Sequence, residues 1–196
     1  MSLAIRILAA VVFATQLSGV LAQQSAAKPP AAPDYGVNGI FPGENLLNPY
    51  LPPSPEWQAR SNKENGIYRM IWLRGNEIYG VTVIRDSRGS LTELREINDQ
   101  PGRANCESFD SSVRSKTVTP YPSITWLTDC KRGGRTAVQM LHRAIRGADS
   151  HYLIQKTWRG PVGADELQLW EGRIKSASVC DTRKAPGCPA GLRELK

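Results

Sequence analysis

The sequence predicts an α+β domain with a mainly antiparallel sheet of four or five strands and two longer helices, preceded by a Pro-rich arm. Short runs rich in β-branched and aromatic residues follow one another across turn signals. Two other stretches have apolar residues at helical spacing, and helices and strands do not alternate strictly. We expect a signal peptide at 1–22, an extended arm at 23–53 and one disulfide-stabilised domain at 54–196.

The first 22 residues are typical of a secretory signal peptide. Arg6 gives a positive start, and the apolar run 7–14 is too short to span a bilayer. Val20 and Ala22 occupy the small-residue positions of a cleavage site, so we expect cleavage between Ala22 and Gln23. We therefore expect a periplasmic or secreted protein with no transmembrane segment after cleavage.

The segment 23–53 is rich in Pro and Ala and lacks apolar periodicity, which indicates an extended arm. Three roles stay open for it: a spacer, a polyproline ligand for another protein, or a strap across the domain surface. A strap would use Phe41, Leu46, Leu47 and Tyr50.

The domain is expected to begin with a short helix at 54–61, because Ser54 suits the N-cap and Pro55 the first helical turn. Strands are predicted at 66–74 and 77–85, joined by a Gly-Asn hairpin turn. The next expected elements are a third strand at 90–97, an irregular segment at 103–122 and a strand at 123–130.

The first longer helix is predicted at 136–146. Thr136 and Gln139 match a capping box, Gly147 suits the helix end, and apolar residues recur at helical spacing between them. A strand is the alternative there, through the alternation of Val138, Met140 and His142. The last expected elements are a strand at 151–159 and a second helix at 165–177.

The four cysteines of an exported chain indicate two disulfides. Three pairings are open from the sequence alone. We favour Cys180–Cys188, because a Pro-Gly turn lies between them, and this leaves Cys106–Cys130. The spacing of cysteines and histidines does not match a zinc site, so we expect no metal and no cofactor.

Five tryptophans are many for one modest domain. We assign Trp72, Trp126 and Trp170 to the core and leave Trp57 and Trp158 open. A stacking platform for single-stranded nucleic acid or carbohydrate is the alternative for aromatic and basic residues on a sheet.

The net charge of +7 is uneven, because residues 131–196 hold thirteen basic and six acidic residues. On the predicted helix, Arg135, His142 and Arg146 share one flank. Lys131 and Arg132 precede its N-terminus, where unpaired N–H groups bind anions. The predicted anion-binding residues are Lys131, Arg132, Arg135, Thr136, His142 and Arg146. A charged face that contacts only water is the alternative.

We interpret the chain as an exported, bacterial-type binding or accessory protein of the cell envelope with a basic surface for an anionic partner. The expected partner is an envelope polymer, a lipid surface or an acidic protein patch; nucleic acid is not expected, because no recognition motif is present. One alternative is a small secreted hydrolase or nuclease that uses His142 and His151, the only histidines. Another is a toxin or enzyme inhibitor.

Overall fold

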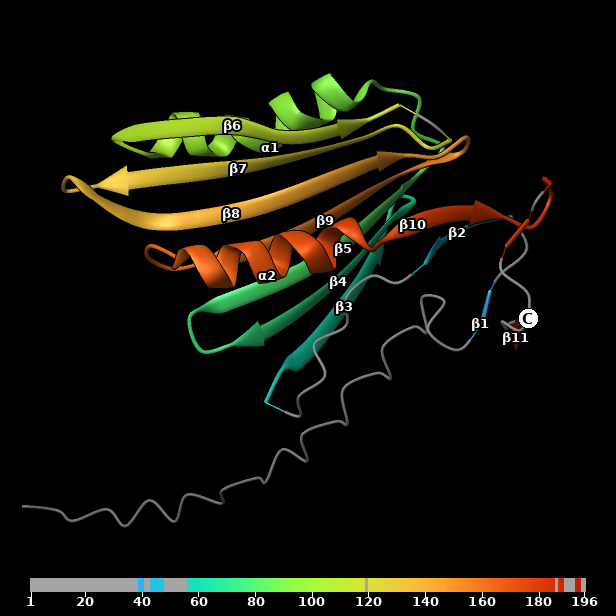
Figure 1. Ribbon diagram of the computed structural model, residues 1–196, viewed down its shortest axis with the longest axis horizontal. Helices are drawn as coiled ribbons and strands as arrows, with labels where there is room; N and C mark the ends of the chain where they lie inside the picture. The colour runs from blue at the N-terminus through green and yellow to red at the C-terminus, as the bar shows by residue number, and fades with distance from the viewer. Residues whose placement is uncertain are drawn as a thin grey trace, which may run out of the picture.

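The computed structural model describes residues 39–40, 43–47, 56–118, 120–185, 187–188 and 193–194. Within them the protein is α+β with two helices, as the sequence predicts (Figure 1). The main sheet has seven antiparallel strands, so the expected number of four or five was too low. No described helix has the length and apolar character needed to cross a membrane. The predicted signal peptide lies outside the described residues.

Two meanders build the main sheet. Its strand order is β3-β4-β5-β9-β8-β7-β6, so strands β3 to β5 form one meander and β6 to β9 form another, joined where β9 pairs with β5. The strands are β3 (Gln58–Glu64), β4 (Ile67–Arg74), β5 (Glu77–Arg85), β6 (Ser108–Thr117), β7 (Ser123–Arg132), β8 (Arg135–Arg146) and β9 (Ser150–Trp158). The helices are α1 (Leu91–Asn105) and α2 (Ala164–Lys175).

The helices cover opposite faces of the sheet (Figure 1). Successive side chains of a strand point to opposite faces, so each strand contributes to two cores. The larger core includes Trp170 and Ile174 of α2. The smaller core packs Leu91 and Leu94 of α1 against four buried residues of β7, β8 and β9.

A two-stranded sheet lies on the α2 face. It consists of β2 (Glu44–Leu47) and β10 (Ser178–Asp181), which pair antiparallel, and we call these two strands the strap. Leu46 and Val179 belong to the larger core, and Leu47 is also buried. The strap interpretation of this segment is thus supported at Leu46 and Leu47, whereas Phe41 and Tyr50 lie outside the described residues. A short parallel pair joins β1 (Gly39–Ile40) to β11 (Arg193–Glu194).

The predicted helix at 136–146 was wrong, because this segment is strand β8. Leu141 and Ile145 pack in the α2 core, while Ala144 packs in the α1 core. A strand buried on both faces does not show a clean polar–apolar alternation. Its apolar residues therefore fall at helical spacing without forming a helix.

The predicted strand at 90–97 was also wrong, because helix α1 begins there. Ser90 Oγ accepts the Glu93 N–H at 3.1 Å, and the Glu93 carboxylate accepts the Ser90 N–H at 2.6 Å. This capping box satisfies two N–H groups of the first turn. The predicted strand instead continued the meander of the two preceding strands into this segment, and the meander was expected to end at the Pro-Gly pair 101–102.

Two further predictions failed at the sheet edges. Residues 58–61 of the helix predicted at 54–61 lie in edge strand β3, while 54 and 55 lie outside the described residues. The segment 103–122, expected to be irregular, contains the end of α1 and edge strand β6. Edge strands are often polar because one side faces water, so they lack the apolar signal of central strands.

The other expected elements are confirmed. Strands β4, β5, β7 and β9 and helix α2 lie where the sequence predicts them. Cys106–Cys130 and Cys180–Cys188 are disulfides, with Cα–Cα distances of 5.4 and 5.0 Å. The assigned tryptophans are in the core, and the two left open, Trp57 and Trp158, are buried as well.

Candidate functional site

The predicted anion-binding residues do not share one place in the fold. Their N-terminal members lie at the tip of the β7–β8 hairpin: Lys131, Arg132, Arg135 and Thr136. Arg146 lies at the other end of β8, about 36 Å from Arg135 at about 3.3 Å per residue. Because β8 is a strand, the helix N-terminus expected to bind the anion is not present.

The hairpin tip already uses groups that the sequence assigned to an anion. Gly133 and Gly134 have φ values of 57° and 68°, as a two-residue hairpin turn requires. The Gly133 N–H donates to Glu107 Oε2 at 2.6 Å, and Arg132 Nη2 donates to the Asn105 carbonyl at 3.0 Å. An intramolecular carboxylate therefore occupies the backbone donor, and anion binding at this tip stays a prediction.

His142 is a core residue with a 2% exposed side chain. Its ring stacks on Trp126 at 4.5 Å between ring centres. Nδ1 lies 3.1 Å from the Gln155 amide nitrogen and Nε2 lies 3.1 Å from Thr128 Oγ1. Since an amide nitrogen donates, Nδ1 accepts and Nε2 carries the proton. Burial lowers the pKa of His142 to about 4, so the ring is neutral at pH 7.

His151 lies elsewhere on the α1 face, at the start of β9, and is 1% exposed. Its position is four residues along β9 from Gln155, the register partner of His142, which separates the two histidines by about 13 Å. Burial also lowers the pKa of His151. The described structure therefore does not bring His142 and His151 to one substrate.

A buried lysine marks one end of the α2 face. Lys156 is 0% exposed, and its Nζ lies 4.8 Å from the ring centre of Trp57, 5.3 Å from Trp158 and 4.4 Å from Trp170. We call these four residues the tryptophan cage. Aromatic faces attract a cation, and more so when water is excluded. The sequence does not reveal this cluster, because its members come from the residue before β3, from β9 and from α2.

Glu77 balances the charge of the cage. Its carboxylate accepts from Lys156 Nζ and, at 2.9 Å, from Arg74 Nη2. Burial lowers the pKa of Lys156, and the hydrogen bond to Glu77 partly opposes this shift. Burial also acts to raise the pKa of Glu77, but the hydrogen bonds from Lys156 and Arg74 outweigh it and hold that pKa below its usual value. The cage is a closed, neutralised part of the core.

A cavity of about 400 Å³ lies at the other end of the same face, between the strap and the main sheet. Its floor is a row of register partners across four adjacent strands: Lys63, Tyr68, Val83 and Tyr152. The strap contributes Glu44, Asn45 and Leu46, and the lining is completed by Ser61, Asn62, Arg69 and Arg85. This volume is within the range of small-molecule sites, which begins near about 300 Å³.

Glu44 seats the strap on the β8–β9 turn. Its carboxylate accepts the Asp149 N–H at 2.8 Å and also the Ala148 N–H. A Cβ atom at Gly147 would lie 2.5 Å from a carboxylate oxygen of Glu44. The bare Gly147 backbone is thus what lets the buried Glu44 approach the turn.

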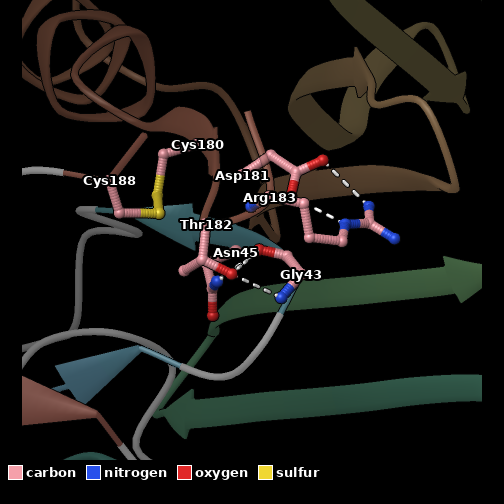
Figure 2. Close-up of a disulfide and its surroundings, with 7 residues drawn as sticks. All are labelled: Gly43, Asn45, Cys180, Asp181, Thr182, Arg183 and Cys188. Carbon is pink, nitrogen blue, oxygen red and sulfur yellow. Dashed lines mark hydrogen bonds and ion pairs between the residues drawn. A yellow bond between two sulfur atoms is a disulfide. The ribbon is translucent and has the colours of Figure 1, made fainter. Parts of the chain in front are cut away.

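The same end of the strap is closed by a hydrogen-bonded corner and is braced by a disulfide (Figure 2). The Gly43 N–H donates to Thr182 Oγ1 at 2.7 Å, and the Thr182 N–H donates to the Gly43 carbonyl at 3.0 Å. Cys180 in β10 is bridged to Cys188, which packs with Leu47. The cross-link therefore reinforces the strand that holds β2.

An ion-pair network continues from this corner to the β8–β9 turn. Arg183 Nε donates to Asp181 Oδ1 at 2.8 Å (Figure 2), and its Nη2 also pairs with Asp149. The hydrogen bond from Arg183 lowers the pKa of Asp181 to about 2. Both Glu44 and Arg183 thus tie the strap region to the same turn.

Tyr152 lines the cavity and has a buried hydroxyl. Its side chain is 1% exposed, and its hydroxyl has no hydrogen-bond partner among the described residues. Burial raises the pKa of Tyr152, Glu44 raises it further, and the nearby Ser150 hydroxyl opposes the shift without forming a hydrogen bond within 3.5 Å. The hydroxyl is therefore a neutral donor at pH 7, and a buried donor without a partner is costly.

Within the described ranges, no three His, Cys, Asp or Glu residues lie close enough to hold a metal ion. The cavity was missed from the sequence because its floor and wall come from segments up to about a hundred residues apart. The one available signal was the pair Tyr68 and Trp72, which is interleaved with Arg69 and Arg74 on β4. No family model matches this chain, and a search of curated proteins found no similar sequence.

Proposed function

We propose that this protein is an exported binding protein that holds a small molecule with an apolar body in the strap cavity. One observation carries the proposal: an apolar floor of Tyr68 and Val83 lies beside the buried Tyr152 hydroxyl, which no described residue satisfies. Small-molecule sites typically combine an apolar lining with a few placed polar groups. An accessory role in the cell envelope is part of this proposal.

Export is supported by the signal-like N-terminus and by the two disulfides. Disulfides form and persist in oxidising compartments, such as the periplasm and the extracellular space. The anionic partner expected from the sequence is assigned here to the cavity, because Glu107 occupies the donor at the hairpin tip. The hydrolase alternative is not proposed, because His142 and His151 are buried and apart.

The proposal is tested with a neutral apolar fluorophore, N-phenyl-1-naphthylamine, added to the oxidised protein. Ser61 is exposed on β3 and lines the cavity, so Ser61→Trp fills it from the edge. Gln58 is exposed on the opposite face of the same strand, so Gln58→Trp is the matched control. We expect fluorescence enhancement with the native protein and with Gln58→Trp, and its loss with Ser61→Trp at unchanged circular dichroism.

Equal enhancement by both variants would contradict the proposal, because the fluorophore would then bind outside the cavity. Absence of enhancement with the native protein would contradict it as well.

A further inference from the structure

We propose that the ligand of the strap cavity is an amphipathic anion, with its acidic group at Tyr152 and Arg85 and its apolar body along Val83 and Tyr68. This inference rests on the proposed function and adds the chemical class and the orientation of the ligand. It is argued from the charges around the cavity and from the order of the residues on its floor.

Several cations of this face have carboxylate partners, whereas those that line the cavity have none in the described part of the chain. Lys156, Arg74 and Arg183 all have carboxylate partners within 4 Å. Lys63, Arg69 and Arg85 line the cavity, and none of them has an ion-pair partner among the described residues. Lys63 Nζ lies 4.9 Å from the ring centre of Tyr68, and Arg85 Nη1 donates to Ser150 Oγ at 3.4 Å. Three cations without a described ion-pair partner in one cavity favour an anionic ligand.

The register places the acidic group of the ligand. Val83 is opposite Tyr152, and Arg85 is opposite Ser150, two residues toward the start of β9. Arg85 is therefore the diagonal neighbour of Tyr152 on the face that lines the cavity. A carboxylate between them would accept hydrogen bonds from the Tyr152 hydroxyl and from the Arg85 guanidinium. A guanidinium suits a carboxylate because its N–H groups can donate to both oxygens.

Glu44 is the carboxylate that opposes an anion in this cavity. Its charge is partly offset, because it accepts two backbone N–H groups of the β8–β9 turn. With Lys63 and Arg85 against Glu44, the cavity keeps a net positive charge. The apolar body extends from Tyr152 across Val83 to Tyr68, which spans two strand spacings or about 10 Å.

The test compares three probes that share one chain and differ in the head group: decanoate, decan-1-ol and decylamine. Binding to the oxidised protein is measured by titration calorimetry at pH 7, below micellar concentrations. We expect decanoate to bind at least tenfold more tightly than decan-1-ol, and decylamine to bind most weakly. The preference for decanoate should shrink as salt is added, because partly exposed charges are screened.

Two variants test whether Tyr152 and Arg85 bind the acidic head group of the ligand. Tyr152→Phe should weaken decanoate about tenfold, because a hydrogen bond to a charged acceptor is lost. The same variant should fold at least as stably as the native protein, since the hydroxyl has no partner in the fold. Arg85→Gln should weaken decanoate and leave decan-1-ol unchanged. Arg60→Gln, on the opposite face of β3, is the matched control for charge and should change neither.

The outcomes separate the two proposals. Equal binding of decanoate and decan-1-ol overturns the anionic class but leaves the cavity as a binding site. Tightest binding of decylamine also overturns it and identifies Glu44 as the group that selects charge. Failure of all three probes, together with the fluorophore, contradicts the proposed function itself.

Discussion

The two ends of the α2 face differ in how the same sheet is covered. At one end, Trp170 of α2 closes over Lys156, and the charge of this lysine is neutralised by Glu77. At the other end, four residues away along β9, the strap covers Tyr152 and leaves a cavity of about 400 Å³. A helix with a large aromatic side chain fills its end, whereas a narrow two-stranded strap does not.

The contrast between the tryptophan cage and the cavity separates the part that stabilises the fold from the part proposed to bind a ligand. The cage satisfies the charge of its buried cation with a carboxylate and three rings, and the indole N–H of Trp158 is the one buried donor of the cage without a hydrogen-bond partner among the described residues. The cavity leaves the Tyr152 hydroxyl without a described hydrogen-bond partner, and Lys63, Arg69 and Arg85 have no described ion-pair partner. Changes in the cage should therefore affect folding, and changes around the strap should affect ligand exchange.

The largest effect is expected from Trp170→Ala, which empties the cage end. Trp170 is 2% exposed, and its ring centre lies 5.4 Å from that of Tyr79. Truncation of a buried Trp typically costs about 4 kcal/mol, and we expect a loss of that size in urea unfolding. Leu169→Ala is the matched control on the exposed side of α2 and should cost little. A loss near that of the control would show that the cage does not hold the fold together.

The two disulfides separate global stability from the strap. Their sequence separations are 24 for Cys106–Cys130 and 8 for Cys180–Cys188. Chain entropy predicts losses of about 3.5 and about 2.5 kcal/mol when each pair is replaced by Ser. We expect the first replacement to leave fluorophore affinity unchanged and the second, less destabilising one to weaken it. The reverse pattern of affinities would contradict the role given to the strap.

The α1 face of the sheet, which holds His142, is expected to lose stability in acid. The folded state keeps His142 neutral with a pKa of about 4, while the unfolded chain takes up a proton below about pH 6.5. Stability is thus insensitive to this group above pH 6.5 and falls as pH decreases toward 4, by about 3 kcal/mol in total. The depressed pKa of Asp181 acts in a separate window, below pH 4.

Urea unfolding at several pH values checks this prediction. In His142→Gln, the unfolding free energy should depend less steeply on pH between 6.5 and 4.5 than in the native protein. The reason is that the group with the most strongly depressed pKa in this range is absent. An unchanged slope would mean that His142 can be protonated in the folded state. Asp99, which opposes the shift, and Arg95, which adds to it, are present in both proteins.

Elements with one buried face were easier to predict from the sequence than a strand buried on both faces. Helix α2 and the hairpin of β4 and β5 were predicted, because local periodicity and turn residues agree with the structure. Strand β8 was taken for a helix because α1 and α2 bury both of its faces. Helix α1 was missed although its capping box is local, because two predicted strands precede it and Pro101 and Gly102 interrupt its helical pattern.

The candidate site was less predictable than the fold. Cysteine pairing could be inferred from a turn between Cys180 and Cys188. Nothing local indicates that Glu44 reaches Asp149, or that Tyr68 and Tyr152 lie in one row. Residues 131–146 were predicted to bind an anion because their basic side chains are close in sequence. Strand β8 instead places Arg135 and Arg146 at its two opposite ends.

The smallest expected effect concerns Glu44, where the strap meets the β8–β9 turn. Glu44→Gln keeps the size of the side chain but provides one acceptor oxygen for two N–H donors. One hydrogen bond to a charged group is lost, so we expect a decrease of about 1.5 kcal/mol in unfolding free energy. Because the loss falls on the strap, release of the neutral fluorophore should accelerate severalfold in stopped-flow experiments.

Two variants determine whether this effect is local. Gly147→Ala adds a methyl group where the Glu44 carboxylate lies and should reproduce the faster release while keeping the negative charge. Glu64→Gln removes an exposed carboxylate of β3 and should change neither rate nor stability. Faster release in Glu44→Gln alone would assign the effect to charge, and faster release in both strap variants would assign it to the seating of β2. The second result would establish that the cavity opens where the strap leaves the turn, independently of the tryptophan cage.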